Sequence, residues 1–173
     1  MGADLTEFSP GHFALDVAIK GGIVFTLQNL VKGVLPIAIA SSWDTPPTNL
    51  ANATDGNIDT VTGTGTSTGK GIYGNYGVIS FDLGSVKNIL VGGKVGLWAT
   101  TGSSEIYVQA SADNIHFYNT DFLLAEYGNI ERIGWLSSVN VVCRYITFIL
   151  TSNTNTTVNM KIYELMIYNL GTL

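Results

Sequence analysis

The chain has 173 residues, of which 46% are hydrophobic and only 12% are charged, and its formal net charge is −5. This length fits one domain with or without an extension, and it allows a core large enough to fold without disulfides or a structural metal. The acidic balance, with no basic stripe among the eight Lys and Arg residues, excludes nucleic acid as a partner. No apolar run approaches the ~20 residues of a membrane span, so we expect no membrane insertion.

The cysteine content and the N-terminal segment predict neither a disulfide framework nor a secretory signal peptide. Cys143 is the single cysteine, so no intramolecular disulfide framework can form, and its apolar neighbours predict a buried thiol. Residues 1–13 lack the basic and apolar regions of a secretory signal peptide. We therefore expect no signal peptide, and a place in the cytoplasm, on a virion or particle surface, or outside the cell after lysis.

Alternation of apolar and polar residues with a period of two runs through the chain and predicts an all-β protein. Residues 12–27 alternate on both sides of a Gly-Gly pair and predict a β-hairpin with a tight turn. Residues 28–33 could instead form a short helical turn. Residues 34–40 predict an edge strand, because Pro36 has no backbone N–H to donate to a sheet.

The second half of the chain continues the strand pattern after a long loop. Residues 41–77 are rich in Gly and Thr and predict a loop that is functional or held by a bound group. Alternation then predicts strands at residues 78–83, 89–98, 105–111, 144–151 and 161–169. Trp98 ends one of them and is expected in the core. Seven or eight short strands separated by turns indicate a β-sandwich or barrel.

Five short motifs follow one another between residues 51 and 168. They are ANATDGNIDT at 51–60, VISFDLG at 78–84, YVQASADNIHF at 107–117, CRYITF at 143–148 and IYELMIY at 162–168. Their order resembles that of the discoidin family, which includes the C-type domains of coagulation factors V and VIII and the family 32 carbohydrate-binding modules. The resemblance implies a discoidin-like jelly-roll β-sandwich over residues 34–173, with residues 1–33 as an N-terminal β-hairpin extension.

The chain departs from the family pattern at two aromatic positions. Thr62 stands where the family usually has Trp, and Phe117 lies near a position that is often Trp. The first departure puts the family's core packing at that point in doubt.

A candidate cation site lies in the first motif. Asp55, Asn57 and Thr60 offer side-chain and carbonyl oxygens around Gly56, and hard oxygen ligands of this kind suit Ca²⁺. The resemblance implies Glu164, in the closing strand, as the last ligand. A carboxylate inside an apolar strand needs a partner to offset its desolvation, and a structural Ca²⁺ would supply one. The alternative is that Asp55 caps a turn and Glu164 faces solvent.

The resemblance also implies that loops at one end of the sandwich bind the ligand. Sugar binding needs an aromatic face together with polar side chains. The candidate ligand residues are the aromatic and polar side chains of the expected loops: Trp43, Tyr73, Tyr76, Asn129, Arg132 and Trp135. Each tryptophan could instead lie in the core or between subunits.

No pattern of catalytic residues is visible. His12 and His116 have no partner motif, and no hydrolase, phosphate-loop or zinc spacing occurs, so we expect no enzyme. The resemblance predicts a non-catalytic binding module for glycans or adhesion, which fits a decoration or receptor-binding protein of a phage or virus particle. The alternative is a structural assembly protein of a virion or other oligomer without a glycan ligand. We expect a homo-oligomer or particle contact through residues 1–33.

Overall fold

The computed structural model describes residues 28–39, 42–69 and 76–170, with the backbone alone for residues 121 and 122. These residues are mostly in β-strands, with the short 3-10 helix η2 (Leu50–Ala53) before β2, which confirms the predicted all-β class. The expected hairpin at residues 12–27 lies outside the described residues. Within the described ranges, no helix has the length and apolar character needed to cross a membrane.

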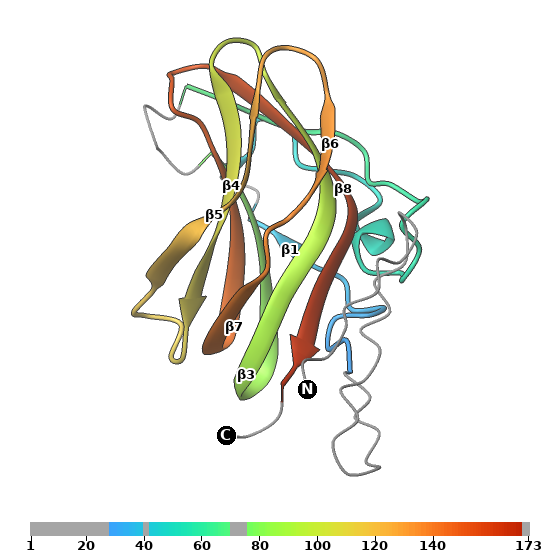
Figure 1. Ribbon diagram of the computed structural model, residues 1–173, viewed down its shortest axis with the longest axis vertical. Helices are drawn as coiled ribbons and strands as arrows, with labels where there is room; N and C mark the ends of the chain where they lie inside the picture. The colour runs from blue at the N-terminus through green and yellow to red at the C-terminus, as the bar shows by residue number, and fades with distance from the viewer. Residues whose placement is uncertain (1–27, 40–41, 70–75, 171–173) are drawn as a thin grey trace, which may run out of the picture.

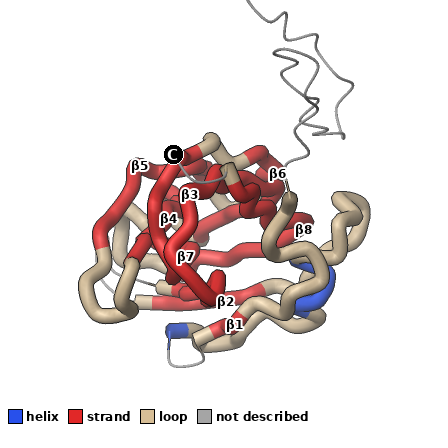
Figure 2. Tube along the Cα trace, turned by 90° about the horizontal axis from the view of Figure 1, so that it is seen from below, coloured by secondary structure: helices blue, strands red, loops and turns tan. Residues whose placement is uncertain are grey.

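The strands form one strongly curled antiparallel sheet. They are β1 (Ile37–Ala38), β2 (Gly65–Thr68), β3 (Gly77–Ala99), β4 (Ser103–Ser111), β5 (Tyr118–Tyr127), β6 (Arg132–Trp135), β7 (Val139–Thr151) and β8 (Thr157–Asn169). The order is β2-β8-β3-β7-β4-β5, and β1 and β6 also pair with β3. Figure 1 shows β3 beside β8, and Figure 2 shows the strands curled around the interior with η2 next to β8.

A bend in the middle of β3 allows the sheet to curl. β3 pairs with β7 on both sides of residues 83–86, which have no partner in the register between the two strands. Gly84 adopts a φ of 78°, a left-handed conformation that favours glycine. Arg144 of β7 donates two hydrogen bonds of 2.8 Å to the carboxylate of Asp82 beside the bend. The bend is thus held by both backbone conformation and a bidentate ion pair.

The core lies between the curled faces of the sheet. Inward side chains of β3, β4, β7 and β8 are buried. They alternate with more exposed residues in the second half of β3 and the first half of β8, whereas β4 and the second half of β7 are buried on both faces. Trp98 lies between the buried residues Leu97 and Ala99, so alternation places its ring on the outward face, where it is half-buried. The prediction that Trp98 belongs to the core is therefore wrong.

Residues 28–33 are attached to the sandwich. The backbone N–H of Leu30 donates to the carbonyl of Ile167 in β8 (2.7 Å), and Val31 is buried in the core. A turn follows at residues 30–33, in agreement with the short helical turn considered for this segment. The hydrogen-bonded sandwich therefore begins before residue 34, where the sequence placed its boundary.

Candidate functional site

The loop of residues 55–60 forms a turn closed by its own side chains. Asp55 accepts the backbone N–H of Asn57 at Oδ1 (2.8 Å) and the hydroxyl of Thr60 at Oδ2 (2.7 Å). The same hydroxyl lies 2.8 Å from the carbonyl oxygen of Asn57, to which it can also donate. The structure therefore brings together the three loop residues that the sequence predicted for a cation site.

Glu164 of β8 completes this group from the sheet. Its side chain is 2% exposed, and its Oε2 accepts the backbone N–H of Gly56 (3.1 Å). Its Oε1 is buried without a hydrogen-bond partner. Burial raises the pKa of Glu164 to about 7, and the negative charge of Asp55 raises it further. The hydrogen bond from the Gly56 N–H and the positive charge of Lys32 act in the opposite direction. The alternative in which Glu164 faces solvent is wrong.

The donor set at this loop favours one class of cation. Among residues 28–39, 42–69 and 76–170, no group of three or more His, Cys, Asp or Glu side chains is placed to hold a metal ion. A cation between Asp55 and Glu164 would therefore need hydroxyl or carbonyl oxygens as well. Such mixed oxygen ligands suit Ca²⁺ and not Zn²⁺, which prefers Cys and His. The orphaned Oε1 of Glu164 fits this requirement.

Two of the predicted ligand residues belong to the core. Trp43 is buried, its indole N–H donates to the carbonyl of Val78 (3.2 Å), and a Cβ at Gly65 or Gly77 would overlap its ring. Tyr76 is fully buried. Neither ring has a face open to a sugar, so the ligand role predicted for Trp43 and Tyr76 is wrong. The glycines provide the space that encloses the Trp43 ring.

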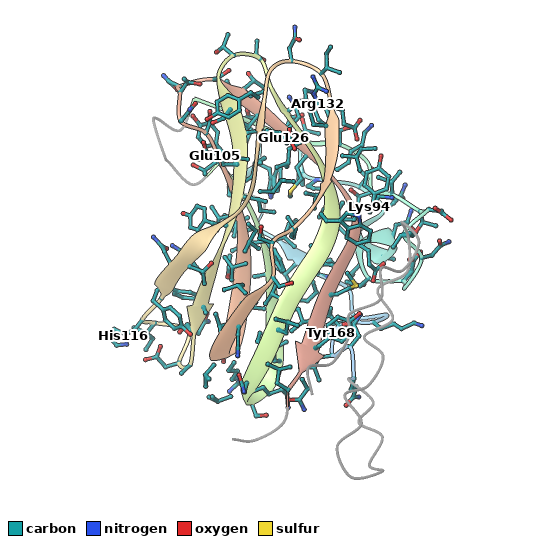
Figure 3. The ribbon with its side chains drawn as sticks, viewed as in Figure 1. Lys94, Glu105, His116, Glu126, Arg132 and Tyr168 are labelled. Atoms are coloured by element: carbon teal, nitrogen blue, oxygen red, sulfur yellow. The ribbon has the colours of Figure 1, made fainter. Side chains whose placement is uncertain are left out.

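Those of the remaining predicted ligand residues that the structure describes do not converge. Tyr73 lies outside the described residues. Asn129 is exposed in the turn between β5 and β6, and Arg132 is exposed at the start of β6, near the end of the sandwich where Figure 3 labels it. Trp135 lies three residues further along the strand and therefore on the opposite face from Arg132. Only Trp135 reaches the outward face of β3.

That outward face carries a pocket. The outer-face pocket is lined by side chains and backbone of β3, β6, β8 and the segment after β6: Leu90, Gly92, Trp135, Ser138, Met166 and Tyr168. The space in and above the pocket, including open solvent at its mouth, amounts to about 440 Å³. The hydroxyl of Tyr168 donates to the sulfur of Met166 (3.2 Å), a weak acceptor, and burial raises the pKa of Tyr168. The hydroxyl therefore remains protonated and can turn to a better acceptor.

Two neighbouring glycines form the floor of the pocket, and they differ in their surroundings. A Cβ at Gly92 would meet no atom within 4 Å, and the φ of Gly92 lies outside the positive region. A Cβ at Gly93 would lie 2.5 Å from the backbone oxygen of Glu164. The missing side chain of Gly92 leaves the pocket open, whereas that of Gly93 allows β3 and β8 to approach each other.

Lysine ammonium groups lie over the aromatic rings of the same face. The Lys94 ammonium is 5.9 Å from the centroid of the Trp135 ring and 5.0 Å from that of Tyr163. The Lys161 ammonium is 5.6 Å from the Trp98 ring and donates to Glu131 (2.8 Å). Figure 3 shows Lys94 and Tyr168 on this side of the molecule, along β3 and β8.

Sequence reasoning identified Trp135 but missed Gly92, Lys94 and Tyr168. The Gly-Gly pair at 92–93 was a visible signal, because glycine inside a strand often marks a site of close approach or open space. The sequence pattern of β8 could not predict that Tyr168 faces the same pocket. A register shift between Lys94 and Val95 inserts an extra residue in β8, which breaks the simple alternation of that strand.

Comparison with known proteins gives the fold. No family model and no curated protein matches the chain. It is similar to the solved structure of chitosan-binding module 1 from a chitosanase/glucanase of Paenibacillus sp. IK-5, with a TM-score of 0.50 and 18% identity over 82% of this chain and 99% of that chain. It is also similar to CBM32-3 from a family 31 glycoside hydrolase of Clostridium perfringens, with a TM-score of 0.45 and 14% identity over 83% and 94% of the two chains.

Identities this low show a shared fold and nothing finer. The predicted β-sandwich is thereby confirmed as the fold. The chain has the β-sandwich fold of the Paenibacillus chitosan-binding module.

Proposed function

We propose that this protein is a non-catalytic glycan-binding module and that its ligand site is the outer-face pocket. The observation that carries the proposal is an open pocket flanked by Trp135 and Tyr168 over the missing side chain of Gly92. Aromatic rings stack on the C–H face of a pyranose, and the hydroxyls of Tyr168 and Ser138 are of the type that bonds sugar hydroxyls. The fold shared with a module named for chitosan binding supports the same class of function.

The surroundings of His116 and Cys143 favour a binding role for the protein over a catalytic one. His116 lies on an exposed turn, with Nδ1 2.7 Å from the carboxylate of Asp113. Asp113 also accepts the Ser111 hydroxyl (3.1 Å) and the backbone N–H of His116 (2.9 Å), so its carboxylate closes the turn. Cys143 is fully buried, and burial raises the pKa of its thiol to about 11. At neutral pH this thiol is protonated and enclosed, so it is not a nucleophile.

We also propose a structural Ca²⁺ at the loop of residues 55–60. Asp55, Thr60, Glu164 and a carbonyl or amide oxygen of Asn57 would hold it, supported by the orphaned Oε1 of Glu164. The ion would neutralise two carboxylates and tie the loop to β8. Its role would be stability, because the loop side chains are not among those that line the outer-face pocket.

A glycan array tests the proposed function with one matched variant. Gly92→Val fills the pocket with a residue that suits a strand and meets no atom at its Cβ, so the fold should be retained. We expect the wild-type chain to bind a defined set of saccharides and Gly92→Val to lose all of them, with an unchanged melting temperature. Gly92→Ala, which fills less space, should show an intermediate loss. Equal binding by wild type and Gly92→Val would reject the pocket as the site.

The alternative of an assembly protein is favoured by one observation. The edge segment around β1 exposes a run of large apolar side chains, with Leu35 65% and Ile37 60% exposed. Contiguous exposed apolar residues at a sheet edge are typical of a contact surface. If this edge mediates self-association, including at a particle surface, light scattering should show a smaller mass for the Leu35→Ser/Ile37→Thr variant than for wild type. A monomer in both cases would remove this alternative.

A further inference from the structure

On the outward face of β3, the residue next to Gly92 in the pocket floor is Lys94. Gly92, Lys94, Gly96 and Trp98 follow one another on the outward face, each about 7 Å from the next. The space above Gly96 is occupied by the side chain of Glu131, whereas the space above Gly92 is empty. Lys94 therefore lies between a filled and an open position, and a ligand ring in the outer-face pocket would lie next to it.

Lys94 differs from the other described lysine of this face in its pairing. Lys161 donates to the Glu131 carboxylate at 2.8 Å, so its charge is compensated. Lys94 takes part in none of the ion pairs formed by the described residues, and its ammonium lies over the rings of Trp135 and Tyr163. A cation held by aromatic rings keeps hydrogen-bond donors for a further partner.

The carboxylate opposite Lys94 in the β3–β8 register forms no ion pair with it. Glu164 is the partner of Lys94 in the β3–β8 register, but its Oε2 accepts the N–H of Gly56 in the loop of residues 55–60. The carboxylate is thus bound at the loop, and it forms no ion pair with Lys94. Since the whole chain carries a net charge of −5, an anionic ligand needs a dedicated cation of this kind to bind.

We infer that the outer-face pocket binds an acidic saccharide, a pyranose that carries a carboxylate or a sulfate, with its ring against Trp135 and its anion at the Lys94 ammonium. The inference rests on the proposed glycan-binding function and names the ligand class of that site. A charge-assisted contact at a partly exposed position corresponds to about a tenfold change in affinity. The affinity gained through Lys94 should fall as salt increases, because exposed charges are screened.

Isothermal titration of the full chain with matched saccharides tests this assignment. The probes are trigalacturonate, its carboxyl-reduced neutral form, and a galactose 6-sulfate trisaccharide. We expect the acidic probes to bind about tenfold more tightly than the neutral one. The tighter of the two acidic probes identifies carboxylate or sulfate as the preferred anion. Lys94→Gln should remove the difference, whereas Lys161→Gln, whose ammonium is already paired with Glu131, should change it less than twofold.

The outcomes separate the inference from the proposed function. If the neutral probe binds as tightly as the acidic ones and Gly92→Val abolishes both, the inference fails and glycan binding at the pocket stands. If Lys94→Gln and Lys161→Gln weaken acidic binding equally, the preference is a general charge effect and the inference fails. If acidic binding persists in Gly92→Val, the anion binds elsewhere and the assignment is overturned. If no saccharide on the array binds to wild type, both proposals fall.

Discussion

Removal of the carboxylate charge at Glu164 should uncouple the stability of the protein from calcium. In the absence of a cation, the buried Oε1 of Glu164 has no partner, and an unsatisfied buried polar atom costs about 1–3 kcal/mol. Glu164→Gln keeps the shape and an acceptor for the Gly56 N–H but removes the charge. Without calcium, Glu164→Gln should therefore be at least as stable as wild type.

With calcium, the order should reverse. Free Ca²⁺ at about a hundredfold its Kd stabilises the folded state by ~2.7 kcal/mol. For a chain of this length the corresponding increase in Tm is about 5–10 °C. Glu164→Gln should gain less than a third of this increase, because the cation loses one of its two carboxylates.

Differential scanning calorimetry in EDTA and in millimolar CaCl₂ measures both effects. Asp59→Asn is the matched control, because Asp59 is an exposed acid of the same loop that contributes only its backbone N–H, to Asn57. The control should keep the full increase in Tm. An equal increase in wild type and Glu164→Gln, or none in wild type, would refute the calcium site.

Three further predictions concern the sandwich itself. Gly93→Ala should lower the free energy of unfolding, measured by urea titration, by about 1–3 kcal/mol, because its Cβ would lie 2.5 Å from a backbone oxygen of β8. In the same assay, Gly92→Ala should change the free energy of unfolding by less than about 0.5 kcal/mol. Trp43→Phe should cost about 1–3 kcal/mol in that assay and leave saccharide affinity unchanged; a loss of affinity without a loss of stability would restore a ligand role for Trp43. Cys143 should not react with a thiol reagent at pH 8 until the protein unfolds, and rapid labelling of the native protein would contradict its burial.

Local periodicity was sufficient for strands whose partners share a regular register. β4 was predicted because Ile106, Val108 and Ala110 alternate with polar residues. β2 was missed, because Gly65–Thr68 contains no apolar residue and is a strand through its pairing with Thr157–Met160 of β8. That pairing joins segments about 90 residues apart and leaves no trace in either local sequence. β5 was missed for a related reason, since two register shifts against β4 disturb its alternation.

The candidate sites also differ in whether they depend on local sequence or on segments far apart in the chain. The loop of residues 55–60 was predictable because its hydrogen bonds connect residues two to five positions apart. Trp43 was misjudged because its neighbours Ser42 and Asp44 are polar, while the space for its ring comes from Gly65 and Gly77 far along the chain. The outer-face pocket was not predictable, because it depends on side-by-side placement of β3, β6 and β8. Placement of this kind follows from the whole fold.

The three tryptophans allow the central claim to be measured in one spectrum. The indole N–H resonances of Trp43, Trp98 and Trp135 report on the core, the outward face away from the pocket, and the pocket wall. In a ¹H–¹⁵N NMR titration with a saccharide found on the array, the Trp135 resonance should shift to saturation while that of Trp43 stays in place. Saturable binding that leaves Trp135 unshifted would contradict a ligand site on the outward face of β3 and β8.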